Sequence, residues 1–100
     1  MLYITVHLYG RTGTPGEFRD YESKALNIFK RHGGEVLVAY TPAVSKDQTG
    51  VPDEIQILKI ASQSDFEGFM GDSDRVALAA ERERVIRKTE VFLSKEIVRY

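Results

Sequence analysis

Residues 2–9 read LYITVHLY, and the two kinds of side chain in this segment alternate without interruption. One face carries Leu2, Ile4, Val6 and Leu8, and the other face carries Tyr3, Thr5, His7 and Tyr9. A period of two residues, with many β-branched and aromatic side chains, is typical of a β-strand. The segment therefore predicts a strand whose apolar face must be covered by whatever follows it in the chain.

The spacing of the apolar residues changes after the loop 10–16, which is rich in glycine. From Glu17 onwards, intervals of three and four residues predict one stripe of an amphipathic helix over residues 17–32. The stripe consists of Phe18, Tyr21, Ala25, Ile28, Phe29 and His32. Gly33 and Gly34 end the helix, and Gly33 suits the left-handed position that follows a helix C-terminus.

The rest of the chain adds three strands and a second helical region. Strands are predicted over 35–44, 54–61 and 89–100, and the polar turn 45–52 separates the first two. Ser64-Asp65-Phe66-Glu67 matches a capping box and predicts a short helix that ends at 69 or 70. Asp72 or Ser73 can cap a further helical segment that runs to about Lys88. The order β-α-β-β-α-β predicts a ferredoxin-like α+β sandwich in one domain, residues 1–100.

Composition narrows the classes of function. The 14 basic and 15 acidic residues give a net charge of −1, so we expect no nucleic-acid and no membrane partner. The third strand also lacks the stacking aromatics of an RNA-recognition motif. The chain contains no cysteine and two histidines, so neither thiolate chemistry nor a histidine-rich metal centre is expected. The first residues resemble neither a signal peptide nor a membrane span, and a cytoplasmic protein is expected.

The predicted strands are apolar on both faces. Val36 and Val38 oppose Leu37 and Ala39 in the second strand, and the third and fourth strands repeat this pattern. Two helices can cover one face of such a sheet, and a large exposed apolar patch is unusual for a monomer. We therefore expect a homodimer with two-fold symmetry. The alternative is that some of these side chains are simply exposed.

Three motifs carry a resemblance that spans nearly the whole chain. They are Glu17-Phe18-Arg19-Asp20-Tyr21, His32-Gly33-Gly34 before a strand, and the run DSDRVALAAER at 72–82. Together they resemble the dimeric α+β-barrel superfamily, in particular its small uncharacterised bacterial branch. The resemblance implies that two ferredoxin-like sheets face each other to form a barrel with the helices outside. Members of the superfamily include cofactor-free monooxygenases of antibiotic biosynthesis, haem-degrading enzymes, muconolactone isomerase and stress-responsive dimers. The chain lacks tryptophan, and it lacks histidine in its last two-thirds, so we expect neither haem nor another cofactor.

Arg82 falls near the centre of the apolar face of the second helical region, and Arg75 lies seven residues earlier on almost the same line. An arginine that points towards a core keeps its charge, so it needs an anion, a carboxylate or a route to water. One interpretation is a pocket between helices and sheet in which Arg82, assisted by Arg75, holds a carboxylate or enolate oxygen. The other is a snorkelling side chain or an internal ion pair with an acid such as Glu22. The resemblance also places an arginine at position 82.

His7 and His32 are the candidates for proton transfer, because histidine titrates near neutral pH. His32 also has a structural explanation, since a cation is favoured at a helix C-terminus. The face of the first strand that carries His7, Tyr3 and Tyr9 can line either a ligand cavity or a dimer interface. Tyr21 and Tyr40 are either hydroxyl donors in a pocket or core residues.

These observations lead to two functional hypotheses. The first is a small cytoplasmic homodimer with a pocket for an aromatic or enolisable anion, which acts as a cofactor-free monooxygenase or isomerase. The second is a ligand-binding or stress-related dimer without catalytic activity.

Overall fold

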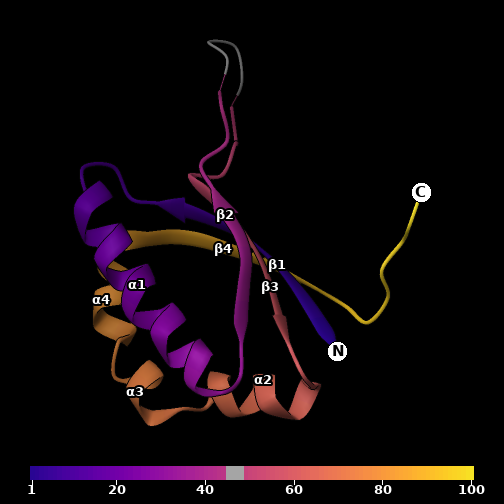
Figure 1. Cartoon of the computed structure of the whole chain (residues 1–100). Coiled ribbons are helices and arrows are strands. Elements are labelled where there is room, and N and C mark those ends of the chain that lie inside the picture. The colour runs from indigo at the N-terminus through magenta and orange to yellow at the C-terminus, as the bar shows by residue number, and fades with distance from the viewer. Residues whose placement is uncertain (45–48) are drawn as a thin grey trace.

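The computed structural model of the protein describes residues 1–44 and 49–100. Its elements are β1 (Leu2–Gly10), α1 (Pro15–Arg31), β2 (Glu35–Tyr40), β3 (Glu54–Ile60), α2 (Gln63–Met70), α3 (Ser73–Val76), α4 (Ala79–Val85) and β4 (Ile86–Ser94). The predicted order is confirmed, with the second helical region divided among α2, α3 and α4. In Figure 1 the helices gather on one side of the sheet.

The sheet has the strand order β2-β3-β1-β4, and all neighbouring strands are antiparallel. β1 is therefore an inner strand: Tyr3 is paired with Lys59 of β3 on one side and with Ser94 of β4 on the other. A four-stranded antiparallel sheet with helices on one side confirms the predicted ferredoxin-like α+β fold.

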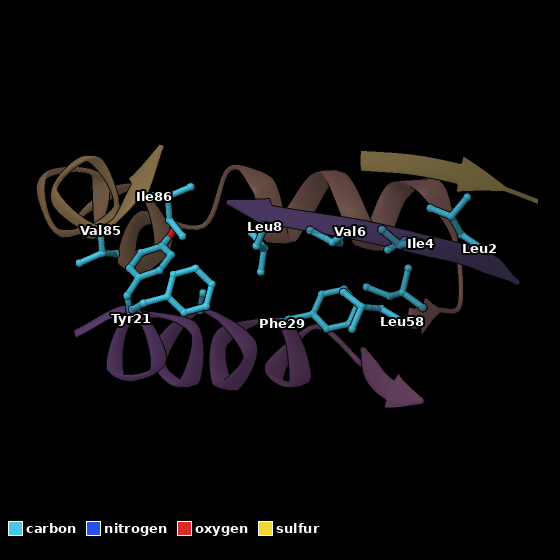
Figure 2. Close-up of a cluster of buried hydrophobic side chains, with 12 residues drawn as sticks. Leu2, Ile4, Val6, Leu8, Tyr21, Phe29, Leu58, Val85 and Ile86 are labelled. Carbon is cyan, nitrogen blue, oxygen red and sulfur yellow. The ribbon is translucent and has the colours of Figure 1, made fainter. Parts of the chain in front are cut away.

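The hydrophobic core lies between β1 and α1. The alternation of β1 directs Leu2, Ile4, Val6 and Leu8 into this core. Helix α1 packs the apolar residues of its predicted stripe against this face. Phe29 of α1 and Ile4 of β1 are each only 1% exposed. Figure 2 shows Phe29 reaching from α1 towards the sheet near Ile4 and Leu58, and Tyr21 reaching towards Val85 and Ile86. Burial of this apolar surface is the main force that holds the helix to the sheet.

The first helix and the second strand differ from the prediction at their ends. α1 begins at Pro15 and not at Glu17, because proline is preorganised for the first helical position. β2 ends at Tyr40 and not at residue 44, because Pro42 lacks the N–H group that a strand ladder needs. Gly33 has a φ of 82°, which confirms its predicted left-handed conformation. Residues 45–48 of the predicted turn lie outside the described part of the chain.

The second helical region departs further from the prediction. The cap of α2 is Ser62 and not Ser64, because Ser62 is extended and its Oγ accepts a hydrogen bond from the backbone N–H of Asp65. The predicted continuous helix from 72 or 73 to Lys88 is wrong. Asp72 does cap α3, but α3 ends at Val76 and α4 spans Ala79–Val85.

The fourth strand includes residues 86–88, which the sequence predicts as helical. β4 begins at Ile86 because Ile86 pairs with Gly10, and the N–H of Arg11 donates to the carbonyl oxygen of Val85 at 2.9 Å. It ends at Ser94 and not at Tyr100, because Ser94 pairs with Tyr3 close to the start of β1. Residues 95–100 extend away from the sheet (Figure 1).

Gly34 tests the packing at the end of α1. A Cβ atom at this position would lie 2.3 Å from Cε2 of Phe29, so Gly34→Ala must displace a core side chain. We expect Gly34→Ala to lower the free energy of unfolding by about 1–3 kcal/mol, measured by urea denaturation. Gly16→Ala is the control, because nothing lies within 4 Å of the added atom. Equal stability of the two variants would contradict this account of the core.

Candidate functional site

A cavity of about 350 Å³ lies between the helices and the sheet. Its walls are mainly apolar, and this volume falls in the range of sites for small molecules. The sheet contributes Ile4, Val6, Leu8, Leu58 and Val91, and the helices contribute Ala25, Leu26, Phe29, Phe66, Phe69 and Met70. Met70 and Val91 are 43% and 48% exposed, so the cavity opens to solvent where these two side chains line it.

Polar side chains from five elements enter the same cavity. They are Tyr21 and Glu22 of α1, Gln56 of β3, Arg75 of α3, Arg82 of α4 and Thr89 of β4. A few convergent polar groups in an apolar cavity are what binding and active sites have in common. Three of the residues chosen from the sequence, Arg82, Arg75 and Tyr21, line this cavity together, and their role in binding stays a prediction.

Glu22 is a buried acid at the base of this site. It belongs to the inward stripe of α1 and is 8% exposed. Its Oε1 atom accepts a hydrogen bond from Nε2 of Gln56 at 2.9 Å. The same Nε2 donates its second hydrogen to Oε2 of Glu54 at 2.7 Å. The side-chain amide of Gln56 thus donates hydrogen bonds to two carboxyl groups.

The environment of Glu22 changes its acidity. Burial raises the pKa of Glu22 to about 7, because the charged form is poorly solvated there. The hydrogen bond from Gln56 lowers this pKa and the charge of Glu54 raises it, while Arg82 and Arg75 lower it. At neutral pH both protonation states of Glu22 are therefore populated, as a group that exchanges protons requires.

Arg82 is partly buried, and its Nη2 atom donates to Oγ1 of Thr89 at 2.7 Å. Within residues 1–44 and 49–100, Arg82 forms no ion pair, so the predicted alternative of a salt bridge with Glu22 is not formed. Its charge acts on Glu22 from a greater distance. A guanidinium group without a carboxylate partner in an apolar cavity can bind an anion.

Arg75 and Tyr21 complete the polar lining. The guanidinium group of Arg75 lies 5.2 Å from the centroid of the Phe69 ring, and Nη1 donates to the carbonyl oxygen of Met70 at 3.1 Å. Tyr21 is 4% exposed, and burial raises the pKa of its hydroxyl, with a smaller rise from Glu22. Its phenol therefore stays protonated at neutral pH and can donate a hydrogen bond into the site.

The other predicted tyrosines and His7 lie on the opposite face of the sheet. Nδ1 of His7 is 3.5 Å from Oε1 of Glu90, and the hydroxyl of Tyr9 donates to the same oxygen at 2.7 Å. This hydrogen bond lowers the pKa of Glu90. Tyr3 shares the face of His7 by the alternation of β1, and Tyr40 of β2 is 47% exposed. None of the four lines the cavity.

His32 also lies outside the cavity lining. Its Nε2 atom is 2.7 Å from Oδ2 of Asp72, whose Oδ1 accepts the cap hydrogen bond from the N–H of Asp74. The bond to His32 is the main reason that the pKa of Asp72 is lowered. His32 thus joins the end of α1 to the start of α3, and a role in proton transfer for His7 or His32 stays a prediction.

Sequence reasoning named Glu22 only as a possible ion-pair partner of Arg82, and it missed Gln56 and Thr89 altogether. A signal was present, because Glu22 lies four residues after Phe18 and three before Ala25, inside the helical stripe. Gln56 shares the alternation of Leu58 and Ile60 on β3. A charged and an amide side chain at core positions each need a buried partner. The pairing between them could not be read from the spacing.

In the part of the chain that the structure describes, no cluster of three or more histidine or carboxylate side chains is arranged to hold a metal ion. None of the described helices has the length and hydropathy needed to cross a membrane.

Only the comparison with solved structures gives matches. No protein-family model matches the chain. No curated protein sequence matches it. Solved structures do match. A protein of unknown function from Rhodopseudomonas palustris has a TM-score of 0.82 and 14% identity, over 98% of this chain and 83% of that one.

Two other solved structures have more informative descriptions. SnoaB, a cofactor-independent oxygenase from Streptomyces nogalater, has a TM-score of 0.71 and 13% identity over 98% of this chain and 94% of its own. A dimeric ferredoxin-like protein of unknown function from Thermobifida fusca has a TM-score of 0.63 and 12% identity over 93% and 88%. The chain thus has the ferredoxin-like α+β fold found in this oxygenase and in these proteins of unknown function.

The protonation of Glu22 predicts how stability depends on pH. The pKa of Glu22 is raised to about 7 in the folded chain, from the ordinary value of 4.5 for an exposed glutamate. The folded state therefore binds more protons between these values, and the free energy of unfolding falls as pH rises through this window. We expect Glu22→Gln to abolish this contribution, which is about 3 kcal/mol in total. Urea denaturation at several pH values gives the free energy of unfolding of wild type and variant. If the difference between these two free energies does not change with pH, the raised pKa of Glu22 is contradicted.

Proposed function

We propose that the protein is a small homodimer that binds an aromatic or enolisable anion in the cavity between its helices and its sheet, and that it acts on this molecule as a cofactor-free monooxygenase or isomerase. The observation that carries the proposal is the combination of an apolar cavity of about 350 Å³ with Arg82, which has no carboxylate partner among the described residues.

The chemistry of the lining supports a ligand of this class. The rings of Phe29, Phe66 and Phe69 offer apolar and aromatic surface to a planar molecule. Arg82 and Arg75 offer positive charge to a carboxylate, phenolate or enolate oxygen at the same site. Because charged hydrogen bonds are strong where water is excluded, these groups stabilise an anion that forms during a reaction as well as one that is bound.

The fold shared with SnoaB favours the monooxygenase over other enzymes. Without a cofactor, the substrate itself must give electrons to dioxygen, and a deprotonated aromatic or enolisable molecule can do this. An isomerase needs the same deprotonated intermediate and no oxidant. The second candidate is a ligand-binding dimer without activity, and it is favoured if a bound molecule is recovered unchanged.

Arg82→Met tests the binding of the anion. We expect phenylpyruvate and the saturated acid 3-phenylpropionate to bind at least about tenfold more weakly to this variant, because a charged hydrogen bond contributes about 1.5–3 kcal/mol. Isothermal titration calorimetry measures the affinity. Thermal stability should change little, because Arg82 pairs with no acid in the described chain.

Arg84→Met is the matched control. Arg84 belongs to the same helix, but it is exposed and pairs with Glu17 at 3.1 Å. Its replacement should leave the affinity for both acids unchanged. If Arg82→Met binds both acids as wild type does, the proposed anion site is wrong.

The open face of the sheet supports the homodimer. It carries the apolar side chains Val38, Tyr40 and Phe92, which are 46%, 47% and 54% exposed. Ile55 and Ile57 of β3 share this face, because they pair with Tyr40 and Val38. A second copy that covers this surface would remove a large apolar patch from water. The Thermobifida fusca protein of the same fold is dimeric, which supports a dimer for this chain.

Sedimentation equilibrium tests the assembly. At micromolar concentration we expect a mass of twice 11.3 kDa for wild type. Phe92→Glu should shift the equilibrium to the monomer, because it places a charge in the apolar contact. Val76→Glu is the control, since Val76 is 57% exposed on α3, away from the open face. A wild-type monomer, or loss of the dimer in the Val76→Glu control alone, would contradict the proposed homodimer.

A further inference from the structure

We propose that Glu22 is the general base of the cavity, which removes a proton from a carbon or oxygen atom of the bound molecule next to the anion held by Arg82. This proposal rests on the proposed binding function and assigns the proton-transfer step to a residue of α1, in place of either histidine.

The geometry of the carboxyl group leaves one oxygen free for a ligand. Oε1 of Glu22 accepts the hydrogen bond from Gln56 at 2.9 Å. Oε2 has no hydrogen-bond partner in the described chain. Every fully buried side-chain oxygen of the described residues has a hydrogen-bond partner. Because Oε2 has no such partner, it is accessible. Glu22 also lines the cavity. A carboxylate with one oxygen anchored and the other open to the site is well placed to accept a proton.

Gln56 acts as a positioning residue for this carboxylate. It is 2% exposed, and its two N–H donors are directed to Glu22 and Glu54. Because both acceptors are carboxylates, the orientation of the amide group is determined and its N–H side faces Glu22. The carboxyl plane of Glu22 is therefore held in the site before a ligand arrives, as general base catalysis requires.

The charges around Glu22 suit a base that works near neutral pH. The titratable and charged groups that act on it are Glu54 from β3, Arg75 from α3, Arg82 from α4 and the neighbouring Tyr21. The cavity residues of β1 and β4, and of α2, carry no charge. Burial and the charge of Glu54 raise the pKa of Glu22, while the two arginines lower it. The carboxyl group therefore does not remain permanently protonated.

The step is balanced without an oxidant, a metal ion or a second substrate. Oε2 forms an O–H bond as the C–H bond next to a carbonyl group breaks. The electron pair of the C–H bond becomes the C=C bond of an enolate, and the carbonyl π pair moves to oxygen, where Arg82 stabilises the charge. Return of the proton to another position gives an isomer. Exchange with solvent results when the proton on Oε2 is first replaced by a deuteron from D₂O, which is then delivered to the same carbon.

Phenylpyruvate is a suitable probe, because it combines an aromatic ring, a carboxylate and an acidic CH₂ group. Loss of its CH₂ signal in D₂O, followed by ¹H NMR and corrected for the buffer rate, measures proton abstraction. We expect Glu22→Gln to lower this rate at least about 100-fold, the usual contribution of a general base. The Kd for the non-enolisable analogue 3-phenylpropionate should stay within about threefold, because the arginines are intact.

Two further variants keep the test decisive. Glu17→Gln is the matched control, since Glu17 is an exposed acid of the same helix and should leave the rate unchanged. Glu22→Asp retains the acid but withdraws it by one methylene, so the rate should fall about tenfold with the same Kd. If Glu22→Gln does not fold, Glu22→Asp gives the answer. In wild type the rate should rise with pH up to about 7 and then level off, and this profile should disappear in Glu22→Gln.

The outcomes separate this proposal from the proposed function. Wild type that neither binds 3-phenylpropionate nor exchanges phenylpyruvate overturns both. Wild type that binds both acids, with an exchange rate unaffected by Glu22→Gln and Glu22→Asp, overturns only the role of Glu22. Exchange that persists in Glu22→Gln and is lost in His7→Gln also overturns it, and the role then passes to His7.

Discussion

Packing of α1 along β1 is the interaction on which the rest of the structure depends. The aliphatic face of β1 and the stripe of α1 are both nearly free of solvent, with Phe29 and Ile4 each 1% exposed. This contact determines how α1 is rotated about its axis. Because Glu22 belongs to the same stripe, the rotation that buries Phe29 must also direct the carboxyl group of Glu22 towards the sheet. The cost of burying that acid is reduced by Gln56, whose amide group lies opposite it on β3.

The second helical region explains why a cavity exists beside this core. A single long helix would have covered the sheet with one continuous apolar stripe. The chain instead forms α2, α3 and α4, which are short and are interrupted between Met70 and Ser73 and again between Val76 and Ala79. Their side chains enclose a space that the core does not fill, with Phe66 and Phe69 on one wall. Arg75 and Arg82 line the same space, where their charges lower the pKa of Glu22 and oppose the effect of burial.

The two faces of the sheet carry different chemistry. The helix side holds the cavity, with an acid, an amide and two guanidinium groups in apolar surroundings. On the open side the hydroxyl of Tyr9 donates to Glu90, His7 lies 3.5 Å from the same carboxyl oxygen, and the ring of the exposed Phe92 packs against His7. Adjacent residues of β1 thus serve different surfaces, since successive side chains of a strand point to opposite faces. The proposed ligand binding and the proposed association can be altered separately for this reason.

The sequence by itself determined the order of the elements, the two faces of β1, the inward stripe of α1 and the position of Arg82 on an apolar helix face. These features repeat with the period of one local element, so a short window contains all the information. Only the tertiary structure decided that Ile86 leaves the helix for β4, that Arg82 meets Thr89 and not Glu22, and that Glu22 meets Gln56. Each of these contacts joins different elements, and Glu22 and Gln56 lie 34 residues apart. Their distance in space follows from how α1 settles on the sheet, which no local period encodes.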